Sequence, residues 1–181
     1  MASFGHIGQG ATHATPMAAD VKFSLRTIAP EDGVVTALYA DLQNDGSEVQ
    51  ALRMGIYNDA ISMPGATLVD DSDVVLIAPG ATRAFVRFTG INASIISGAV
   101  YWLTLQAGAT GGSASFWYDD LVGSELIAND TFSDNMAPSY GPITTSASRS
   151  VALYGDYTPV SSQVPGLKQV VLGRKFGAGV T

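Results

Sequence analysis

Apolar and polar residues alternate along most of this chain in short runs, with the period of a strand that buries one face. In residues 21–26, Val21, Phe23 and Leu25 share one face, while Lys22, Ser24 and Arg26 share the other. The same alternation recurs at residues 34–43, 50–58, 82–89, 98–107, 113–119 and 150–157, and more weakly at 67–69, 74–77 and 121–128. No long stretch has a helical period free of Gly or Pro, so the pattern predicts an all-β protein.

Turn-forming residues separate these runs. Residues 52–69 predict two strands joined at the Pro64–Gly65 corner, and the Asn44-Asp45-Gly46 sequence predicts a hairpin. The pattern counts about eight or nine strands, a number typical of a sandwich or barrel. A long connection over residues 120–148, before a final strand, favours a two-sheet antiparallel jelly-roll sandwich over a meander.

The regular pattern covers residues 21–157, which we predict to be one jelly-roll domain. Residues 1–20 are rich in Gly, Ala, Ser and Thr without periodicity, and we predict an irregular N-terminal arm. Residues 158–181 form a predicted C-terminal tail with one short strand at residues 168–172. The tail holds three of the nine basic residues and no acidic residue, whereas the body is acidic.

The charge of the chain limits the partners that we expect. Only 14% of the residues are charged and the net charge is −7, with a pI near 4.5. An acidic chain without a basic stripe argues against a nucleic-acid partner. The absence of Cys excludes disulfides and thiolate chemistry. No apolar run has the length of a membrane span and the first residues do not resemble a signal peptide, so we expect no membrane partner and no Sec-type export.

Several short motifs occur in an order that resembles one known family. They are FGHIG at 4–8, RMGIY at 53–57, PGATL at 64–68, YWLTL at 101–105, FWYD at 116–119, FSD at 132–134 followed by Pro138 and Gly141, and residues 151–157 before a Pro. The chain resembles the jelly-roll domain of minor tail, head-decoration and other virion proteins of tailed bacteriophages. Relatives of that domain occur in bacterial secreted, carbohydrate-associated proteins. The resemblance implies a β-sandwich and a virion component, and it carries over no catalytic residue.

Catalytic and metal-binding chemistry is not expected. The two histidines, His6 and His13, lie in the predicted arm without a third His or a Cys to complete a metal site. No Gly-x-Ser-x-Gly motif accompanies them, which argues against a serine hydrolase. The acidic residues of three segments could ligate Ca²⁺, but they lack an EF-hand pattern and are typical turn formers: Asp70, Asp71, Asp73, Asp119, Asp120, Asp130 and Asp134. We therefore predict a non-enzymatic protein without a cofactor or metal.

Two surfaces remain as candidates for binding. The first consists of the terminal arms, with Phe4, His6, Lys168, Val170, Leu172, Arg174, Lys175 and Phe176 as expected contacts to neighbouring subunits. The second consists of Trp102 and Trp117, which would stack on sugar rings if they faced solvent. Core packing is the alternative for each tryptophan.

The leading hypothesis is a structural protein of a bacteriophage virion, a capsid decoration, minor capsid or minor tail protein. Its arms would attach it to other virion subunits, as one of several copies on the particle, after assembly in the cytoplasm of the bacterial host. The alternative hypothesis is a carbohydrate-binding module that recognises host-surface or polysaccharide glycans.

Overall fold

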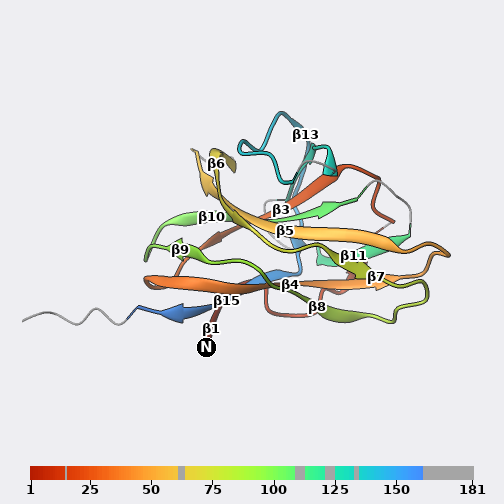
Figure 1. Ribbon diagram of the computed structural model, residues 1–181, viewed down its shortest axis with the longest axis horizontal. Coiled ribbons are helices and arrows are strands. Elements are labelled where there is room, and N and C mark those ends of the chain that lie inside the picture. The colour runs from red at the N-terminus through yellow and green to blue at the C-terminus, as the bar shows by residue number, and fades with distance from the viewer. Residues whose placement is uncertain (15, 61–63, 109–112, 121–124, 133–134, 161–181) are drawn as a thin grey trace, which may run out of the picture.

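The computed structural model describes residues 1–160, except residue 15 and segments 61–63, 109–112, 121–124 and 133–134 (Figure 1). This part of the chain is all-β, and its strands form two antiparallel sheets. No helix among the described residues is long and apolar enough to cross a membrane. The prediction of an all-β chain with two antiparallel sheets is confirmed.

The first sheet is organised around the long strand β4 (Gly33–Asn44). Its order is β1 (Ala2–Gly5), β15 (Leu153–Pro159), β4, β11 (Ala114–Asp119) and β14 (Ser150–Val151). β2 (Thr12–His13) pairs with β11, while β8 (Ala84–Phe88) and β9 (Ala93–Ile95) pair with β4. Leu38 of β4 lies opposite Gly155 on one side and Phe88 on the other, so the buried face continues across three strands.

The second sheet is centred on β10 (Val100–Ala107). Its order is β13 (Ile143–Ala147), β12 (Glu125–Asn129), β3 (Val21–Ile28), β10, β5 (Gln50–Asp59) and β6 (Pro64–Asp71), with β7 (Val75–Ile77) paired to β5. Leu103 lies opposite Leu25 and Ile56. The alternating apolar positions of neighbouring strands therefore meet on one face, as the sequence pattern requires.

The main core lies between the two sheets. Its buried side chains come from both layers, including Leu25, Leu38, Ile56, Phe88 and Leu103. Removal of this apolar surface from water, worth about 25 cal/mol per Å², contributes most to the stability of the fold.

A second, smaller core lies on the outer face of the second sheet. The chain after β12 crosses this face, so Met136 and Tyr140 pack on Tyr57 and Trp102. The predicted long connection over residues 120–148 therefore holds two strands, β12 and β13, and covers a sheet face that would otherwise meet solvent.

Three details of the prediction are corrected. The first residues are not an irregular arm, because β1 pairs with β15 and β2 pairs with β11. The Asn44-Asp45-Gly46 turn does not close a hairpin, because β4 and β5 belong to different sheets. The described residues contain fifteen strands, because short pieces such as β2, β9 and β14 carry too few residues to show alternation.

The two antiparallel strands expected in residues 52–69 are confirmed, but the expected corner at Pro64–Gly65 is wrong, because both residues lie at the start of β6. β5 and β6 pair antiparallel, with Gly55 opposite Asp71 and Asp59 opposite Pro64. The register shifts at two places between these ends. The hairpin is therefore irregular, and residues 61–63 of the connection between its strands lie outside the described residues.

Candidate functional site

Of the two predicted N-terminal contact residues, Phe4 is buried and His6 is partly buried. Phe4 is 4% exposed and packs edge-on against Tyr157, with ring centroids 5.9 Å apart. Phe4 is therefore a core residue, which corrects its assignment as a partner contact. The pattern of residues 1–20 hid this because a single buried aromatic does not produce alternation.

The predicted contacts in the tail are Lys168, Val170, Leu172, Arg174, Lys175 and Phe176, and all six lie outside the described residues. Their role as partner contacts stays a prediction.

Trp102 is not available for sugar stacking. Its side chain is fully buried in the second core, and its Nε1 donates a hydrogen bond to Asp59 Oδ1 at 2.8 Å. Tyr101 and Trp102 are neighbours that point to opposite faces of β10, and both are buried because both faces are covered.

Trp117 is partly buried and already has partners. The guanidinium of Arg83 lies 3.7 Å from its ring centroid, and His13 stacks on it with centroids 4.9 Å apart. Its Nε1 donates to Gln43 Oε1 at 3.1 Å. These contacts make Trp117 an anchor that holds β2 against β11 rather than a free platform for a sugar.

His6 joins three segments that are far apart in the sequence. Its Nδ1 lies 2.7 Å from Ser150 Oγ, and its Nε2 lies 3.1 Å from Asp119 Oδ2. Asp119 Oδ1 accepts a further hydrogen bond from the amide of Ala11 at 2.7 Å. Sequence reasoning set aside a Ser-His-Asp cluster because both histidines fall in the N-terminal segment, yet the fold assembles one.

This cluster has the composition of a catalytic triad, but its serine is not placed as the nucleophile of an α/β-hydrolase is. Ser150 lies within β14, in register with Asp119, and not at the strained strand-to-helix turn that presents a nucleophile beside its oxyanion donors. The arrangement is a hydrogen-bonded cluster of His6, Asp119 and Ser150, which we call the polar clasp. Asp119 orients the His6 ring, and Ser150 pairs with its other ring nitrogen. The clasp fixes the chain after β1 to β11 and β14.

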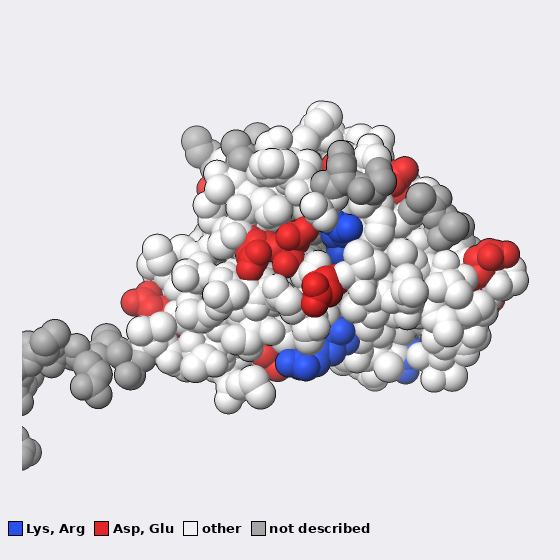
Figure 2. Space-filling model, in the orientation of Figure 1, with Lys and Arg blue, Asp and Glu red and all other residues white. Residues whose placement is uncertain are grey.

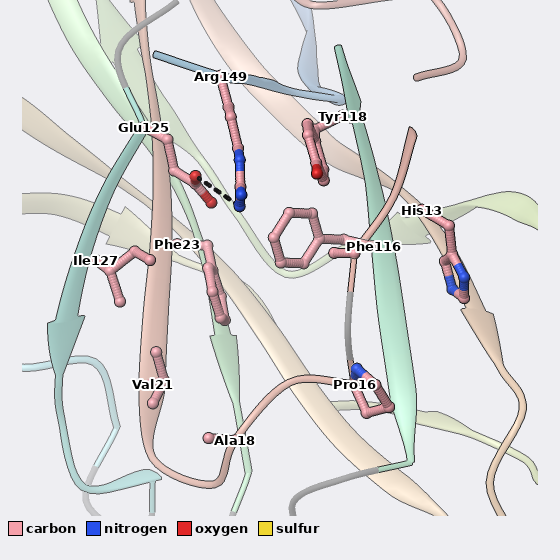
Figure 3. Close-up of a pocket in the computed structure, with 11 residues that line it drawn as sticks. His13, Pro16, Ala18, Val21, Phe23, Phe116, Tyr118, Glu125, Ile127 and Arg149 are labelled. Atoms are coloured by element: carbon pink, nitrogen blue, oxygen red, sulfur yellow. Dashed lines mark ion pairs between the residues drawn. The ribbon is translucent and has the colours of Figure 1, made fainter. Parts of the chain in front are cut away.

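A pocket of about 410 Å³ opens between the two sheets, where β3 and β12 face β2 and β11 (Figure 3). Phe23 and Phe116 pack against each other in its lining, with ring centroids 4.7 Å apart. Val21 and Ile127 extend the apolar wall. The pocket is therefore apolar over most of its lining.

Besides His13 and Arg149, this mostly apolar lining holds one acid among the described residues, Glu125. Its side chain is fully buried, and neither carboxylate oxygen has a hydrogen-bond partner among the described residues. The nearest cation is Arg149, whose Nη1 lies 3.8 Å from Oε2. Burial raises the pKa of Glu125 above its usual value, and the charge of Arg149 offsets only part of that rise.

A third feature lies at the end of the molecule where β15 leaves the first sheet (Figure 1), and it consists of three exposed apolar side chains. We call Ile28, Ile96 and Val160 the apolar end; they are 56%, 65% and 57% exposed. The Val160 amide donates to Asp32 O at 3.0 Å, and Asp32 Oδ1 accepts from the Ser97 amide at 2.7 Å. These bonds tie the end of β15 to the turn that carries Ile96.

The acidic residues considered as Ca²⁺ ligands are used elsewhere. Asp70 accepts from the Asn92 amide, Asp71 lies by Arg53, and Asp130 pairs with Lys22. Asp134 lies outside the described residues. Within the described part of the chain, no three His, Asp or Glu side chains are grouped as a metal site.

Comparison of the sequence with protein-family models and with curated proteins finds no match for this chain. Its function must therefore be inferred from the features described above.

Proposed function

We propose that this chain is a non-enzymatic structural protein of a bacteriophage virion, with a jelly-roll sandwich that attaches to neighbouring subunits. The motif resemblance supports the virion class. The observation that carries the attachment is the apolar end, where three large apolar side chains are exposed at the point where the chain continues into residues 161–181.

The surface chemistry supports a protein partner. Figure 2 shows one face of the molecule, most of which lacks charged side chains. An apolar group of this kind, on a surface poor in charge, is typical of an interface with another protein. The apolar end would supply the centre of that interface.

The sequence beyond Val160 supports the same end of the molecule as the attachment point. Residues 161–181 contain Lys168, Arg174 and Lys175 and no acid, while the rest of the chain is acidic. A basic segment that leaves from an apolar patch would complement an acidic neighbour, including a second copy of this chain.

The test is incorporation into particles. Tagged wild-type chain, a variant lacking residues 161–181, and Ile96→Asp are each expressed during infection of the host, and the purified particles are immunoblotted and gold-labelled. We expect the deletion to abolish incorporation and Ile96→Asp to reduce it at least tenfold, because a buried charge opposes association.

Leu76→Asp is the matched control. Leu76 is 66% exposed, almost the same as Ile96. It lies on β7 beside the first residues of β5, at the end of that strand away from the apolar end. At 3.3 Å per residue, the two sites are roughly 20 Å apart. It should incorporate like wild type. Absence of the wild-type chain from particles would contradict the virion role, and normal incorporation of Ile96→Asp would contradict the role of the apolar end.

A further inference from the structure

The pocket between the sheets has a feature that the attachment role does not use. Glu125 lies on β12 opposite Leu25 of β3, so its side chain points inward between the sheets. It is fully buried, and both of its oxygens lack a hydrogen-bond donor in the described structure. Buried carboxylates are nearly always hydrogen-bonded, because an unpaired one costs several kcal/mol.

Arg149 balances the negative charge of Glu125 but donates no hydrogen bond to it. At 3.8 Å, its Nη1 is too far from Oε2 for a hydrogen bond, and its guanidinium lies over the ring of Tyr118, 4.5 Å from the centroid. Glu125 and Arg149 are therefore a pair without net charge whose acceptor oxygens are still unused. A molecule that enters the pocket can donate hydrogen bonds to them.

The pocket also restricts the charge of its ligand. A cation would meet Arg149, and an anion would meet Glu125, at the same polar corner (Figure 3). A neutral ligand avoids both repulsions. It must carry hydrogen-bond donors on one edge, for the Glu125 oxygens, and apolar C–H groups elsewhere, for Phe23 and Phe116.

The volume sets the size of the ligand. About 410 Å³ lies at the lower end of the range for small-molecule pockets. A single pyranose ring fits this description: its adjacent hydroxyls donate hydrogen bonds, and its C–H face packs on aromatic rings.

We propose that this pocket binds one neutral sugar ring, with adjacent hydroxyls donating to Glu125 and its C–H face packed against Phe23 and Phe116. This places a glycan-binding function between the sheets, away from Trp102 and Trp117. It is independent of attachment through the apolar end, because the pocket lies at the start of β3 and Ile28 lies at its end.

The experiment measures binding of a panel of neutral methyl glycopyranosides (glucoside, galactoside, mannoside, rhamnoside and N-acetylglucosaminide) by ligand-observed NMR and calorimetry. The full chain is used as wild type, as Glu125→Gln and as Glu48→Gln. Glu125→Gln keeps the shape of the side chain but replaces one acceptor by a donor. Glu48→Gln makes the same charge change at an exposed site.

We expect at least one glycoside to bind wild type and Glu48→Gln equally, and Glu125→Gln at least tenfold more weakly, the loss that follows removal of a charged acceptor. Failure of every glycoside to bind wild type, or equal binding to Glu125→Gln, would overturn the proposal. So would tighter binding of benzylamine or benzoate than of any glycoside, since those probes test a charged ligand.

Particle incorporation separates this proposal from the proposed function. Glu125→Gln should incorporate normally even where sugar binding is lost. Normal incorporation with no sugar binding by wild type would overturn the pocket's role alone.

Discussion

Two buried charges lie on neighbouring strands of the second sheet, and their surroundings are opposite. Lys22 of β3 points to the outer face, where its Nζ lies 3.1 Å from Asp130 Oδ2 and above the rings of Tyr57 and Tyr140. Glu125 of β12 points inward, and its carboxylate oxygens have no hydrogen bond in the described structure. Both side chains are completely buried.

The comparison separates a structural charge from a candidate ligand-binding charge. Burial lowers the pKa of Lys22, while its hydrogen bond and ion pair with Asp130 act in the opposite direction and stabilise the charged form. Asp130 lies directly after β12, so the pair holds the chain that covers Trp102. Within the described part of the chain, Glu125 forms one ion pair, with Arg149, and its carboxylate oxygens accept no hydrogen bond.

The largest expected effect is at Lys22. Lys22→Ala should lower the free energy of unfolding by about 3–5 kcal/mol, because it leaves Asp130 without its partner and removes the cation from two aromatic rings. Chemical denaturation measures this loss. Arg87→Ala, at an exposed position, should change stability by no more than about 0.5 kcal/mol. A loss below about 1 kcal/mol at Lys22 would show that its pair is not structural.

An intermediate loss of stability is expected at His6, because its side chain is only partly buried but both of its ring nitrogens have partners. His6→Ala should cost about 1–2 kcal/mol, the loss of two hydrogen bonds. Amide hydrogen exchange should accelerate in β1 while β10 stays protected. Uniform acceleration in both strands would contradict a local clasp.

The smallest effect, of opposite sign, is expected at Glu125. At neutral pH, Glu125→Gln should raise the free energy of unfolding by up to about 1 kcal/mol, because it removes a buried charge without breaking a hydrogen bond.

The sign of the pH dependence follows from the raised pKa of Glu125. A carboxyl whose pKa is raised by folding destabilises the folded state once the pH exceeds its unfolded pKa, and the full penalty is reached above its folded pKa. The advantage of Glu125→Gln should therefore disappear below about pH 4.3, the usual pKa of Glu. Melting temperatures of both proteins between pH 3.5 and 8 test this, and a constant difference would contradict it.

Alternation in the sequence predicted strands correctly where each strand has one apolar face, as in β3, β4 and β5. It did not predict which strands pair. Asn44 shows why: its side chain accepts from the Gly46 amide, a local turn, but also donates to Ile77 O, which carries the chain towards the other sheet. Local turn chemistry determines where the chain bends, whereas tertiary packing determines which strands pair.

The candidate site was predicted less well, for two reasons. His6, Asp119 and Ser150 are more than a hundred residues apart at the widest, so no spacing could reveal their cluster. Glu125 did leave a signal, since it shares an inward face with Ile127 and so places an acid at an apolar position. Residues 120–148 were predicted only weakly, and that signal was missed.

The pairing of β1 with β15 has a consequence for folding. Ala2 lies opposite Tyr157, so the first strand stays unpaired until nearly the last described residues have been synthesised. Contacts this distant in sequence carry a high entropic cost of loop closure and slow the folding of β proteins. During synthesis, β1 should therefore wait as an unpaired segment, and closure of the first sheet should be among the last steps of folding.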